Sequence, residues 1–499
     1  MNTLNNIKPE TFEDTGTDEL RDLLQASAAA FVVYRKQSPS QRAHFMRAVA
    51  AELDHASGTL IEVANAETNL GEERLKTELL RTMFQLRSYA DACERGQHLD
   101  LRIDTATSKR PSLRKMNVPL GPVAVFGAAN FPFAYSTAGG DTACAFAAGC
   151  TVIVKAHPAH AHTSELVAGA IRRAAALYHL PPAVFVHVHG RSNGIGRAIV
   201  EHPGVAAVGF TGSFQGGKQL SDWAAQRKVP IPVFAEMSSI NPVFILPRKL
   251  ESDMNTIVEK IAASVTLSAG QFCTNPGLLV ATDDKHTATF INALADKING
   301  TTPAVMLHPG IFKNYVEKRA NALAQNAVEI RAVSSTEPGL NEGAATLAVT
   351  DADTFLSNPL LHGEVFGPYT LLVKCRDAAQ VVELAAALEG QLTSTLIADE
   401  KDLLAHPLLE ETVRYNCGRL IWDGVPTGVE VCLSMQHGGP WPATTDSRFT
   451  AVGADGIRRF VRPVSFQGWP DHLLPDELRD VNSTGMWRTM NNRLTDEPV

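Results

Sequence analysis

Long apolar runs, a basic leader and an excess of positive charge are all missing from this 499-residue chain. No stretch of 18 or more apolar residues occurs, and the N-terminal segment MNTLNNIKPETFEDTG is neither basic nor apolar. We therefore expect no membrane-spanning helix and no secretory signal. The net charge of −8 gives no general attraction to nucleic acid or to an anionic membrane surface. These absences favour a cytoplasmic protein whose partner is a small molecule.

Paired cysteines are missing as well. The seven cysteines include no CxxC spacing, so neither a disulfide framework nor a zinc site is indicated. The histidine-rich stretches HPAHAH (157–162) and HVHG (187–190) have no neighbouring Cys or acidic cluster in the sequence, and we expect no metal there. Isolated cysteines are mostly small core residues. Cys273, in the Gly- and Pro-rich stretch SAGQFCTNPG, therefore needs further evidence before it is assigned as a nucleophile.

Helical and strand-like patterns divide the chain into parts. From Thr17 to about Cys93 apolar residues recur at helical spacing, with Ser38 and Ser40 placed as caps. From Gly121 short apolar strands alternate with helices, and a second series of the same kind starts at residue 241. This alternation predicts two α/β domains with parallel sheets and a boundary near residue 236. The strands are expected at 123–127, 151–156, 183–189, 205–210, 229–235 and 241–246, and in GLLVAT, YTLLVK and LTSTLIA.

Three segments at strand ends have residues suited to chemistry. No GxGxxG follows a predicted strand, but TGSFQGG at the start of a helix lets a pyrophosphate approach the backbone; a plain Gly-rich turn is the alternative. Asn130 in FGAANFPF has an amide that can donate hydrogen bonds, or caps a turn. Glu236 in FAEMSSINP ends an apolar strand, where a carboxylate can act as a general base or can lie on the surface.

The order of these segments is more informative than any one of them. FGAANFP, VIVKAHP, GFTGS, AEMSSINP, GQFC and EVFGP, in that order, resemble the signature segments of the NAD(P)-dependent aldehyde dehydrogenase superfamily over about residues 15–465. HGGPWPATTDSRFTAVG and AGGDTACAFAAGC resemble the bacterial branch of 2,5-dioxovalerate dehydrogenases and luminous-bacterial fatty aldehyde dehydrogenases. The resemblance implies an α/β fold with a Rossmann-type cofactor-binding domain (1–102 and 121–235), an α/β catalytic domain (236–433), an oligomerisation arm and tail (103–120 and 471–499) and a return segment (434–470).

The resemblance also assigns catalytic roles. It makes Cys273 the nucleophile that forms a thiohemiacetal and then a thioester, Glu236 the base for hydrolysis, and the Asn130 amide an oxyanion donor beside the Cys273 backbone N–H. His437 takes the place of an aromatic residue common in the superfamily. It either assists the thiol or is structural.

Cofactor contacts are implied in the same way. The residue three positions after Lys155, often a Glu in NAD-specific relatives, is Pro158 here, which favours NADP while leaving NAD possible. Arg191 either contacts the extra phosphate or is a solvated loop residue. The expected cofactor-binding residues are Lys155, His157, Arg191, Gly212, Ser213, Gly217, Glu364 and Phe366.

The substrate and the assembly are less constrained. The branch resemblance favours 2,5-dioxovalerate, with Arg81 as a candidate carboxylate clamp unless it pairs with Glu78 on the same helix. Phe133 and Trp441 equally suit an apolar channel for a fatty aldehyde. CoA-acylating chemistry and an inactive binding protein are alternatives of a different class, and Glu236 argues against the first. The resemblance further implies a homodimer or homotetramer.

Overall fold

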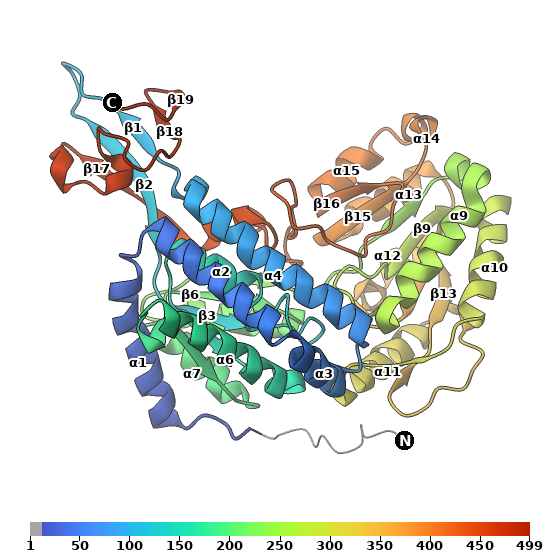
Figure 1. The fold of residues 1–499 in the computed structure, drawn as a ribbon. Coiled ribbons are helices and arrows are strands. Elements are labelled where there is room, and N and C mark those ends of the chain that lie inside the picture. The colour runs from blue at the N-terminus through green and yellow to red at the C-terminus, as the bar shows by residue number, and fades with distance from the viewer. Residues whose placement is uncertain (1–11) are drawn as a thin grey trace.

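The computed structural model describes residues 12–499, which form two α/β domains and a projecting arm (Figure 1). In that view the cofactor-type domain lies at the lower left, the second domain at the right, and the arm with the C-terminus at the upper left. No helix in the described part of the chain is long and apolar enough to cross a membrane.

The N-terminal helices between residues 39 and 95 cover one face of the first domain, whereas Leu20 and Leu24 of the first helix join the hydrophobic core on the other face of the sheet. Ser38 starts the second N-terminal helix with a capping box, because its side chain accepts from the Gln41 N–H while the Gln41 side chain accepts from the Ser38 N–H. Leu86, Tyr89 and other buried residues of the helical layer join the sheet residues in one hydrophobic core. The helices are α1 (Thr17–Tyr34), α2 (Pro39–His55), α3 (Ser57–Thr68) and α4 (Glu72–Arg95).

The first sheet is a five-stranded parallel sheet with the order β5-β4-β3-β6-β7. This order confirms the predicted Rossmann-type arrangement, in which ligands bind beyond the carboxyl ends of the strands. The strands are β3 (Val123–Phe126), β4 (Val152–Lys155), β5 (Phe185–Val188), β6 (Ala207–Thr211) and β7 (Val233–Glu236), and the helices are α5 (Gly140–Ala148), α6 (Ala161–Leu177), α7 (Asn193–Glu201) and α8 (Phe214–Gln226).

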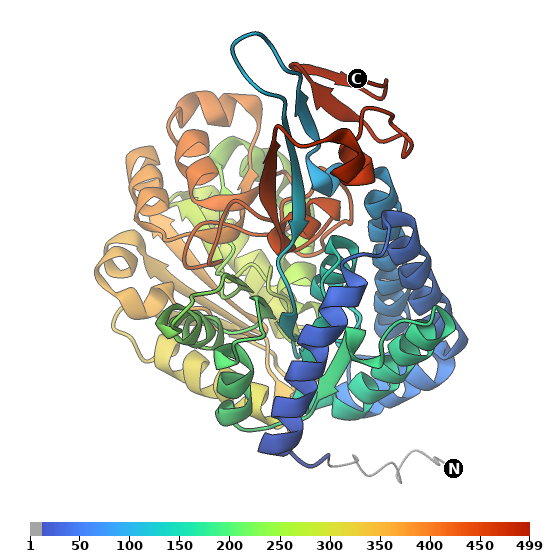
Figure 2. The same ribbon diagram turned by 90° about the vertical axis from the view of Figure 1, so that its left-hand side faces the viewer.

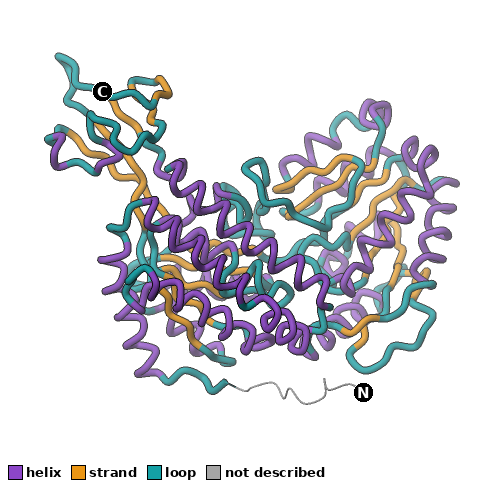
Figure 3. The backbone as a smooth tube through the Cα atoms, in the orientation of Figure 1, coloured by secondary structure: helices purple, strands orange, loops and turns teal. Residues whose placement is uncertain are grey.

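The second domain has a seven-stranded sheet with the order β11-β13-β14-β9-β8-β15-β16, parallel except for the edge strand β11. Helices lie on both of its faces (Figure 3). The strands are β8 (Val243–Ile245), β9 (Leu278–Thr282), β11 (Glu329–Val333), β13 (Thr346–Asp351), β14 (Tyr369–Cys375), β15 (Gln391–Ile397) and β16 (Cys417–Trp422). The helices are α9 (Pro247–Thr266), α10 (Lys285–Asn299), α11 (Pro309–Leu323), α12 (Ala352–Ser357), α13 (Ala378–Ala387), α14 (Glu400–Ala405) and α15 (Leu409–Tyr415); β10 (Ala304–Val305) and β12 (Glu342–Gly343) form a small separate ribbon.

The arm is a five-stranded sheet with the order β17-β2-β1-β18-β19 (Figure 2). It contains the expected segment 103–120 and the C-terminal tail, but it also contains residues 461–467, which we had expected in the return segment. These residues pair antiparallel with β2 along its whole length, so the chain enters the arm before residue 470. The strands are β1 (Arg102–Asp104), β2 (Leu113–Pro119), β17 (Val461–Gln467), β18 (Arg488–Met490) and β19 (Arg493–Thr495).

Candidate active site

Cys273 follows a strained turn between the two domains. Ser268 and Ala269 have φ values of 50° and 53°, and Gly270 continues the left-handed run at 64°, a conformation that costs a non-glycine residue free energy. A Cβ on Gly270 would lie 2.3 Å from the backbone of Gly367. The GQFC and EVFGP segments therefore meet backbone to backbone, which brings the thiol and the second segment together.

One amide side chain fixes the backbone on either side of the thiol. The Asn241 Nδ2 donates to the carbonyls of Cys273 (2.8 Å) and Asn275 (2.9 Å). Gln391 in turn holds the turn at Asn241, because its Oε1 accepts from the Ser239 hydroxyl at 2.9 Å. The backbone N–H of Cys273 donates to no described residue, so it is free to bind an anionic oxygen.

Glu236 and His437 are brought to the thiol by a late segment of the chain. Residues 443–445 pair antiparallel with the end of β7, and the Met237 N–H donates to the Ala443 carbonyl at 2.8 Å. His437 Nε2 lies 2.9 Å from Glu236 Oε1 and 3.8 Å from Cys273 Sγ. One ligand-type atom from each of the three side chains lies within 4.8 Å of the others. Cys273, Glu236 and His437 therefore form one cluster.

The cluster is buried and its charge is poorly compensated. Glu236 is 4% exposed and His437 is 0% exposed, and neither carboxylate oxygen of Glu236 has a hydrogen bond of good geometry with the described residues. Burial raises the pKa of the Cys273 thiol well above its usual value, and the Glu236 carboxylate raises it further. The resting cysteine is therefore a neutral thiol that must lose its proton before it can attack.

Asn130 lies at the same junction and is held there by α4. Its Nδ2 donates to the Gln271 carbonyl at 3.0 Å, and its own carbonyl accepts from Arg74 at 2.7 Å. The Arg74 guanidinium stacks on Phe131 (5.1 Å) and Phe272 (4.9 Å), the neighbours in sequence of Asn130 and Cys273. Arg74 therefore ties the amide to the segment that carries the nucleophile.

The predicted cofactor residues divide between a cavity and a helix start. Arg191 lines a cavity of about 230 Å³ at the carboxyl ends of β4 and β5, together with Pro158 and His189. Lys155 ends β4; burial lowers the pKa of its ammonium, which has no hydrogen bond or ion pair with any described residue. An unsatisfied ammonium beside an open cavity fits the ribose and phosphate groups of NAD(P). His157 caps a short helix, because its Nδ1 accepts from the Ala159 N–H at 3.1 Å.

The glycine-rich turn has two different roles. Ser213 is the N-cap of α8 and accepts from the Gly216 N–H at 3.2 Å, and the Gly212 N–H donates to the Glu236 carbonyl at 3.0 Å. Gly217 corrects our expectation of a pyrophosphate contact. A Cβ there would lie 2.6 Å from the Met237 sulfur, so this glycine serves the packing of α8 against β7. The Phe214 N–H donates to the Ser238 hydroxyl at 3.3 Å, so the Gln215 N–H is the part of the helix start that is suited to a phosphate.

Glu364 and Phe366 lie on the other side of the thiol. Both line a small cavity that also contains Phe272 and Ser239. Burial raises the pKa of Glu364, and its charge in turn contributes to the raised pKa of the Cys273 thiol. Glu364 therefore lies near enough to the thiol to act on it electrostatically, and Phe366 lines the same cavity as Glu364.

The three predicted substrate residues have different surroundings. Phe133 is 1% exposed in the core of the first domain, so it does not line an open channel, contrary to our expectation. Trp441 is 51% exposed and packs edge-to-face on Phe214 at the start of α8. Arg81 forms no ion pair with Glu78 within 4.0 Å; Glu78 Oε1 instead accepts from the backbone N–H groups of Phe133 and Ala134.

The HVH motif also differs from our expectation. A carboxylate does accompany it, since Glu165 of α6 lies 2.9 Å from His187 Nδ1 and 3.1 Å from His189 Nε2. Arg172 lies 2.6 Å from the other oxygen of Glu165. These contacts hold the pKa of Glu165 well below its usual value, and the three side chains have the composition of a metal-ligating group.

Several site residues were not found from the sequence. Arg74, Tyr135, Asn241 and Arg419 all lie around Cys273 or its supports, and of these only Asn241 belongs to a signature segment. Asn241 was within reach, because it directly follows the predicted base segment, in AEMSSINP. The others depend on contacts between segments 50 or more residues apart.

Comparisons with known sequences agree with this geometry. Residues 3–428 match the aldehyde dehydrogenase family. Alpha-ketoglutaric semialdehyde dehydrogenase 2 of Azospirillum brasilense is 46% identical over 93% of this chain and 89% of its own length. The alpha-ketoglutaric semialdehyde dehydrogenase of Acinetobacter baylyi is 40% identical over 99% of this chain and 96% of its own length.

Solved structures share the fold. Apo betaine aldehyde dehydrogenase from Staphylococcus aureus superposes with a TM-score of 0.80 at 16% identity, covering 94% of this chain and 92% of that one. A 1-pyrroline-5-carboxylate dehydrogenase from Thermus with bound NAD superposes with a TM-score of 0.77 at 18% identity, covering 91% and 86%. With its family match, its relatives and its cluster of thiol, carboxylate and amide between two α/β domains, this chain belongs to the aldehyde dehydrogenase family and is an aldehyde-oxidising, NAD(P)-dependent enzyme.

Proposed function

We propose that the enzyme oxidises 2,5-dioxovalerate to 2-oxoglutarate with Cys273 as nucleophile and Glu236 as general base. The observation that carries the assignment of the chemistry is the buried cluster in which sulfur, imidazole and carboxylate atoms lie within 4.8 Å of one another. The substrate rests on the two relatives of that activity, which cover almost the whole chain at 40% and 46% identity.

The first step joins the sulfur to the aldehyde carbon. The thiol proton passes to the His437–Glu236 pair, whose nitrogen is 3.8 Å from Sγ, while the new C–S bond forms. The C=O bond becomes a C–O⁻ bond whose charge lies toward the Asn130 amide and the free Cys273 N–H. Donors fixed before the reaction stabilise this oxyanion without the cost of reorganising water.

The second half of the reaction releases the acid. NAD(P)+, when bound, accepts the hydride that leaves the former aldehyde carbon. The acyl group then remains on Cys273 as a thioester. Glu236 accepts a proton from a water molecule, the water oxygen bonds to the acyl carbon, and the C–S bond breaks to restore the thiol.

The cofactor residues favour NADP. Arg191 lines the cavity after β4 and β5, and Lys155, which has no hydrogen bond or ion pair with any described residue, directly precedes Ala156 in its lining. Pro158 lines the same cavity and offers no carboxylate to repel a 2′-phosphate. Glu67 also lines the cavity, but its oxygens accept from the N–H groups of His162 and Thr163 at the start of α6. Two cations near the ribose side therefore support binding of the phosphorylated dinucleotide.

The test of the substrate is a matrix of kcat/KM values. 2,5-Dioxovalerate, succinic semialdehyde, pentanal and decanal are compared with NAD+ and NADP+, with and without CoA. We expect 2,5-dioxovalerate to be preferred and 2-oxoglutarate to form without CoA. A preference for the alkanals by more than about tenfold, which is about 1.4 kcal/mol in the transition state, or formation of an acyl-CoA, would overturn the proposal.

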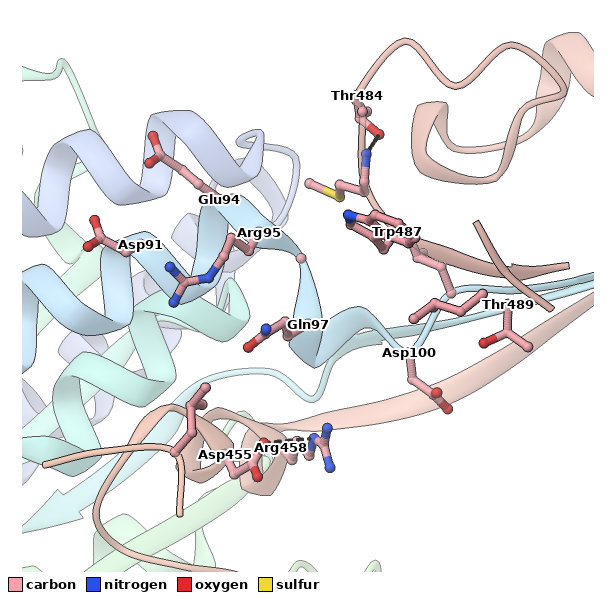
Figure 4. A pocket seen from close by; sticks show the side chains of 16 residues that line it. Asp91, Glu94, Arg95, Gln97, Asp100, Asp455, Arg458, Thr484, Trp487 and Thr489 are labelled. Atoms are coloured by element: carbon pink, nitrogen blue, oxygen red, sulfur yellow. Dashed lines mark hydrogen bonds and ion pairs between the residues drawn. The ribbon is translucent and has the colours of Figure 1, made fainter. Parts of the chain in front are cut away.

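We also propose that the enzyme is a homo-oligomer and that it is cytoplasmic. The arm supports the first of these proposals. A cavity of about 1080 Å³ lies between the end of α4 and the tail, where Gln97 and Trp487 line opposite walls (Figure 4). Trp487 is 60% exposed and Leu494 is 67% exposed, and both line this cavity, so they give it an apolar surface that a second subunit would cover. Light scattering of the full chain is expected to give a dimer or tetramer; a monomer at micromolar concentration would contradict this.

A further inference from the structure

Two arginines next to the nucleophile have no acidic partner. Arg81 of α4 donates to the Tyr135 hydroxyl at 3.2 Å and to the Val429 carbonyl at 3.3 Å. Arg419 of β16 donates to the carbonyls of Gly428, at 2.7 Å, and Pro426. Neither guanidinium forms an ion pair with any described residue. The two side chains therefore come from different domains and meet the same loop, residues 426–429, which we call the clamp loop.

Arg419 lies near enough to the reacting sulfur to act on it electrostatically, and Arg81 contacts Tyr135, whose ring lies near His437. Arg419 acts on the Cys273 thiol, where its positive charge opposes the rise in pKa caused by burial and by Glu236. Burial lowers the pKa of Arg419 itself, while Cys273 and Tyr135 oppose that shift. Its Nε is buried and has no hydrogen-bond acceptor among the described residues. A buried cation with a spare donor next to a reaction centre is suited to a substrate anion.

Tyr135 adds a donor of a different kind. Its oxygen accepts from Arg81, but its own O–H donates to no described residue. Burial raises the pKa of this phenol, so the proton stays on the oxygen at neutral pH. The ring lies 6.1 Å from that of His437, centroid to centroid. Tyr135 therefore presents a neutral hydroxyl donor between the arginines and the catalytic cluster.

Other arginines of the chain show two ways in which a buried guanidinium is satisfied without a substrate. Buried Arg459 has a carboxylate partner, Asp141, at 2.6 Å, and Arg114 has Asp471 and Asp480. Arg42 and Arg488, which are also buried, donate only to carbonyls, as a purely structural arginine does. A structural role is therefore the alternative that the experiment has to separate from substrate binding.

We propose that Arg81 and Arg419 bind the distal carboxylate of the substrate across the clamp loop, and that the Tyr135 hydroxyl donates to its 2-oxo group. This inference rests on the proposed function and explains it chemically. A 2-oxo acid that carries an aldehyde at its other end offers a carboxylate and a ketone oxygen to these three donors, whereas an alkanal offers neither. The donors therefore select the substrate by its charged end while Cys273 acts on the other end.

The test compares charged and neutral aldehydes in matched variants. Arg81→Gln is expected to lower kcat/KM for 2,5-dioxovalerate by about 10- to 100-fold, the effect of a lost charge-assisted hydrogen bond, and to change kcat/KM for pentanal by less than about threefold. Arg419→Gln also removes a charge that acts on the thiol, so both aldehydes should react more slowly, with the loss for 2,5-dioxovalerate about tenfold or more greater than the loss for pentanal. The control is Arg87→Gln, since Arg87 is exposed on the same helix; it should change neither value. An equal fall for both aldehydes in the arginine variants would overturn the clamp and indicate a structural role.

Tyr135→Phe separates the ketone contact from the carboxylate contact. It should reduce the preference for 2,5-dioxovalerate over 5-oxopentanoate, which has the carboxylate but no ketone, by about tenfold. An unchanged preference would remove Tyr135 from the proposal. Arg81→Lys and Arg419→Lys keep the charge and serve if the Gln variants do not fold; they should retain more of the selectivity for the charged aldehyde than any neutral replacement.

Inhibition by glutarate distinguishes failure of the clamp from failure of the proposed function. Glutarate has two carboxylates and no aldehyde, and it should compete with pentanal in the wild-type enzyme and do so about tenfold or more weakly in Arg419→Gln. If the wild-type enzyme does not oxidise 2,5-dioxovalerate but glutarate inhibition depends on the arginines, the substrate assignment is wrong and the clamp is supported. If glutarate inhibits all variants equally or does not inhibit the wild type, the clamp is wrong.

Discussion

Two clusters in this molecule pair a glutamate with histidine, and only the one that also contains a cysteine has the surroundings of a catalytic centre. Glu165 faces His187 and His189 at the edge of the first domain, and Glu236 faces His437 and Cys273 between the domains. Both combine a carboxylate with imidazole at about hydrogen-bond distance. A search for His and Glu side chains alone would treat the two as equivalent.

Their electrostatic surroundings make the difference. Glu165 has an arginine at 2.6 Å in addition to its histidines, and these contacts hold its pKa well below the usual value. Glu236 has no arginine within 4.0 Å among the described residues, lacks well-formed hydrogen bonds to its oxygens, and lies beside a thiol whose pKa is raised. A carboxylate held by an arginine and two histidines stabilises the fold, whereas a carboxylate without an arginine partner, next to a nucleophile, is available for reaction.

Among the changes that test the difference between the two clusters, removing the Cys273 thiol should have the largest effect on kcat. Cys273→Ser is expected to lower kcat by about 10⁴-fold or more, because the acyl group can no longer be carried on sulfur. Steady-state NAD(P)H production measures the change. The matched control is Cys432→Ser, at an exposed cysteine, which should leave kcat unchanged; a loss in the control or activity in Cys273→Ser would refute the assignment.

Removing the oxyanion donor, the side-chain amide of Asn130, should have the second largest effect on kcat. Asn130→Ala removes the amide and is expected to lower kcat by about 100- to 1000-fold with little change in folding. Asn117 is a suitable control, because its side-chain amide also donates to a backbone carbonyl. The acceptor is the His98 carbonyl at 2.8 Å, and Asn117 lies in the arm, outside the active site. A similar loss of kcat in Asn117→Ala, or thermal unfolding of Asn130→Ala at a clearly lower temperature, would point to a structural rather than a catalytic amide.

The pH dependence of alkylation should show a smaller change. Burial and then Glu236 raise the pKa of the Cys273 thiol, so its thiolate fraction and its rate of reaction with iodoacetamide should rise as the pH increases from 7 to 9. Glu236→Gln removes the carboxylate contribution, lowers that pKa, and should speed alkylation at pH 8 by up to about tenfold. Slower alkylation in this variant would contradict the inference that the Glu236 carboxylate raises the pKa of the resting thiol.

The second cluster should give the smallest effect on rate. His187→Asn is expected to change kcat by less than about threefold, while removal of its buried contacts with Glu165 and with Ser164 (2.8 Å) lowers the free energy of unfolding by about 1–3 kcal/mol. Denaturant unfolding and kcat on one preparation measure both. A large fall in kcat without a fall in stability would show that the two clusters are not different in kind.

Local features of the sequence predicted much of the fold and the centre of the site. Ser38 forms the expected cap, and strands such as 152–155 and 278–282 fall within the predicted runs, because apolar strand patterns and caps depend on near neighbours. Phe133, Gly217 and the Glu165–HVH group could not be placed correctly. Their roles depend on which segment packs against them: the first core, Met237, and α6 respectively.

The most direct test of the central claim traps the acyl group. Glu236→Gln should form the thioester and release it slowly, so mixing this variant with 2,5-dioxovalerate and cofactor should give one NAD(P)H per active site in a burst. Peptide mass spectrometry should then find the acyl group on Cys273. The absence of a burst together with an unmodified Cys273, or an acyl group on another cysteine, would contradict the assignment of this sulfur as the nucleophile and of Glu236 as the base that frees it.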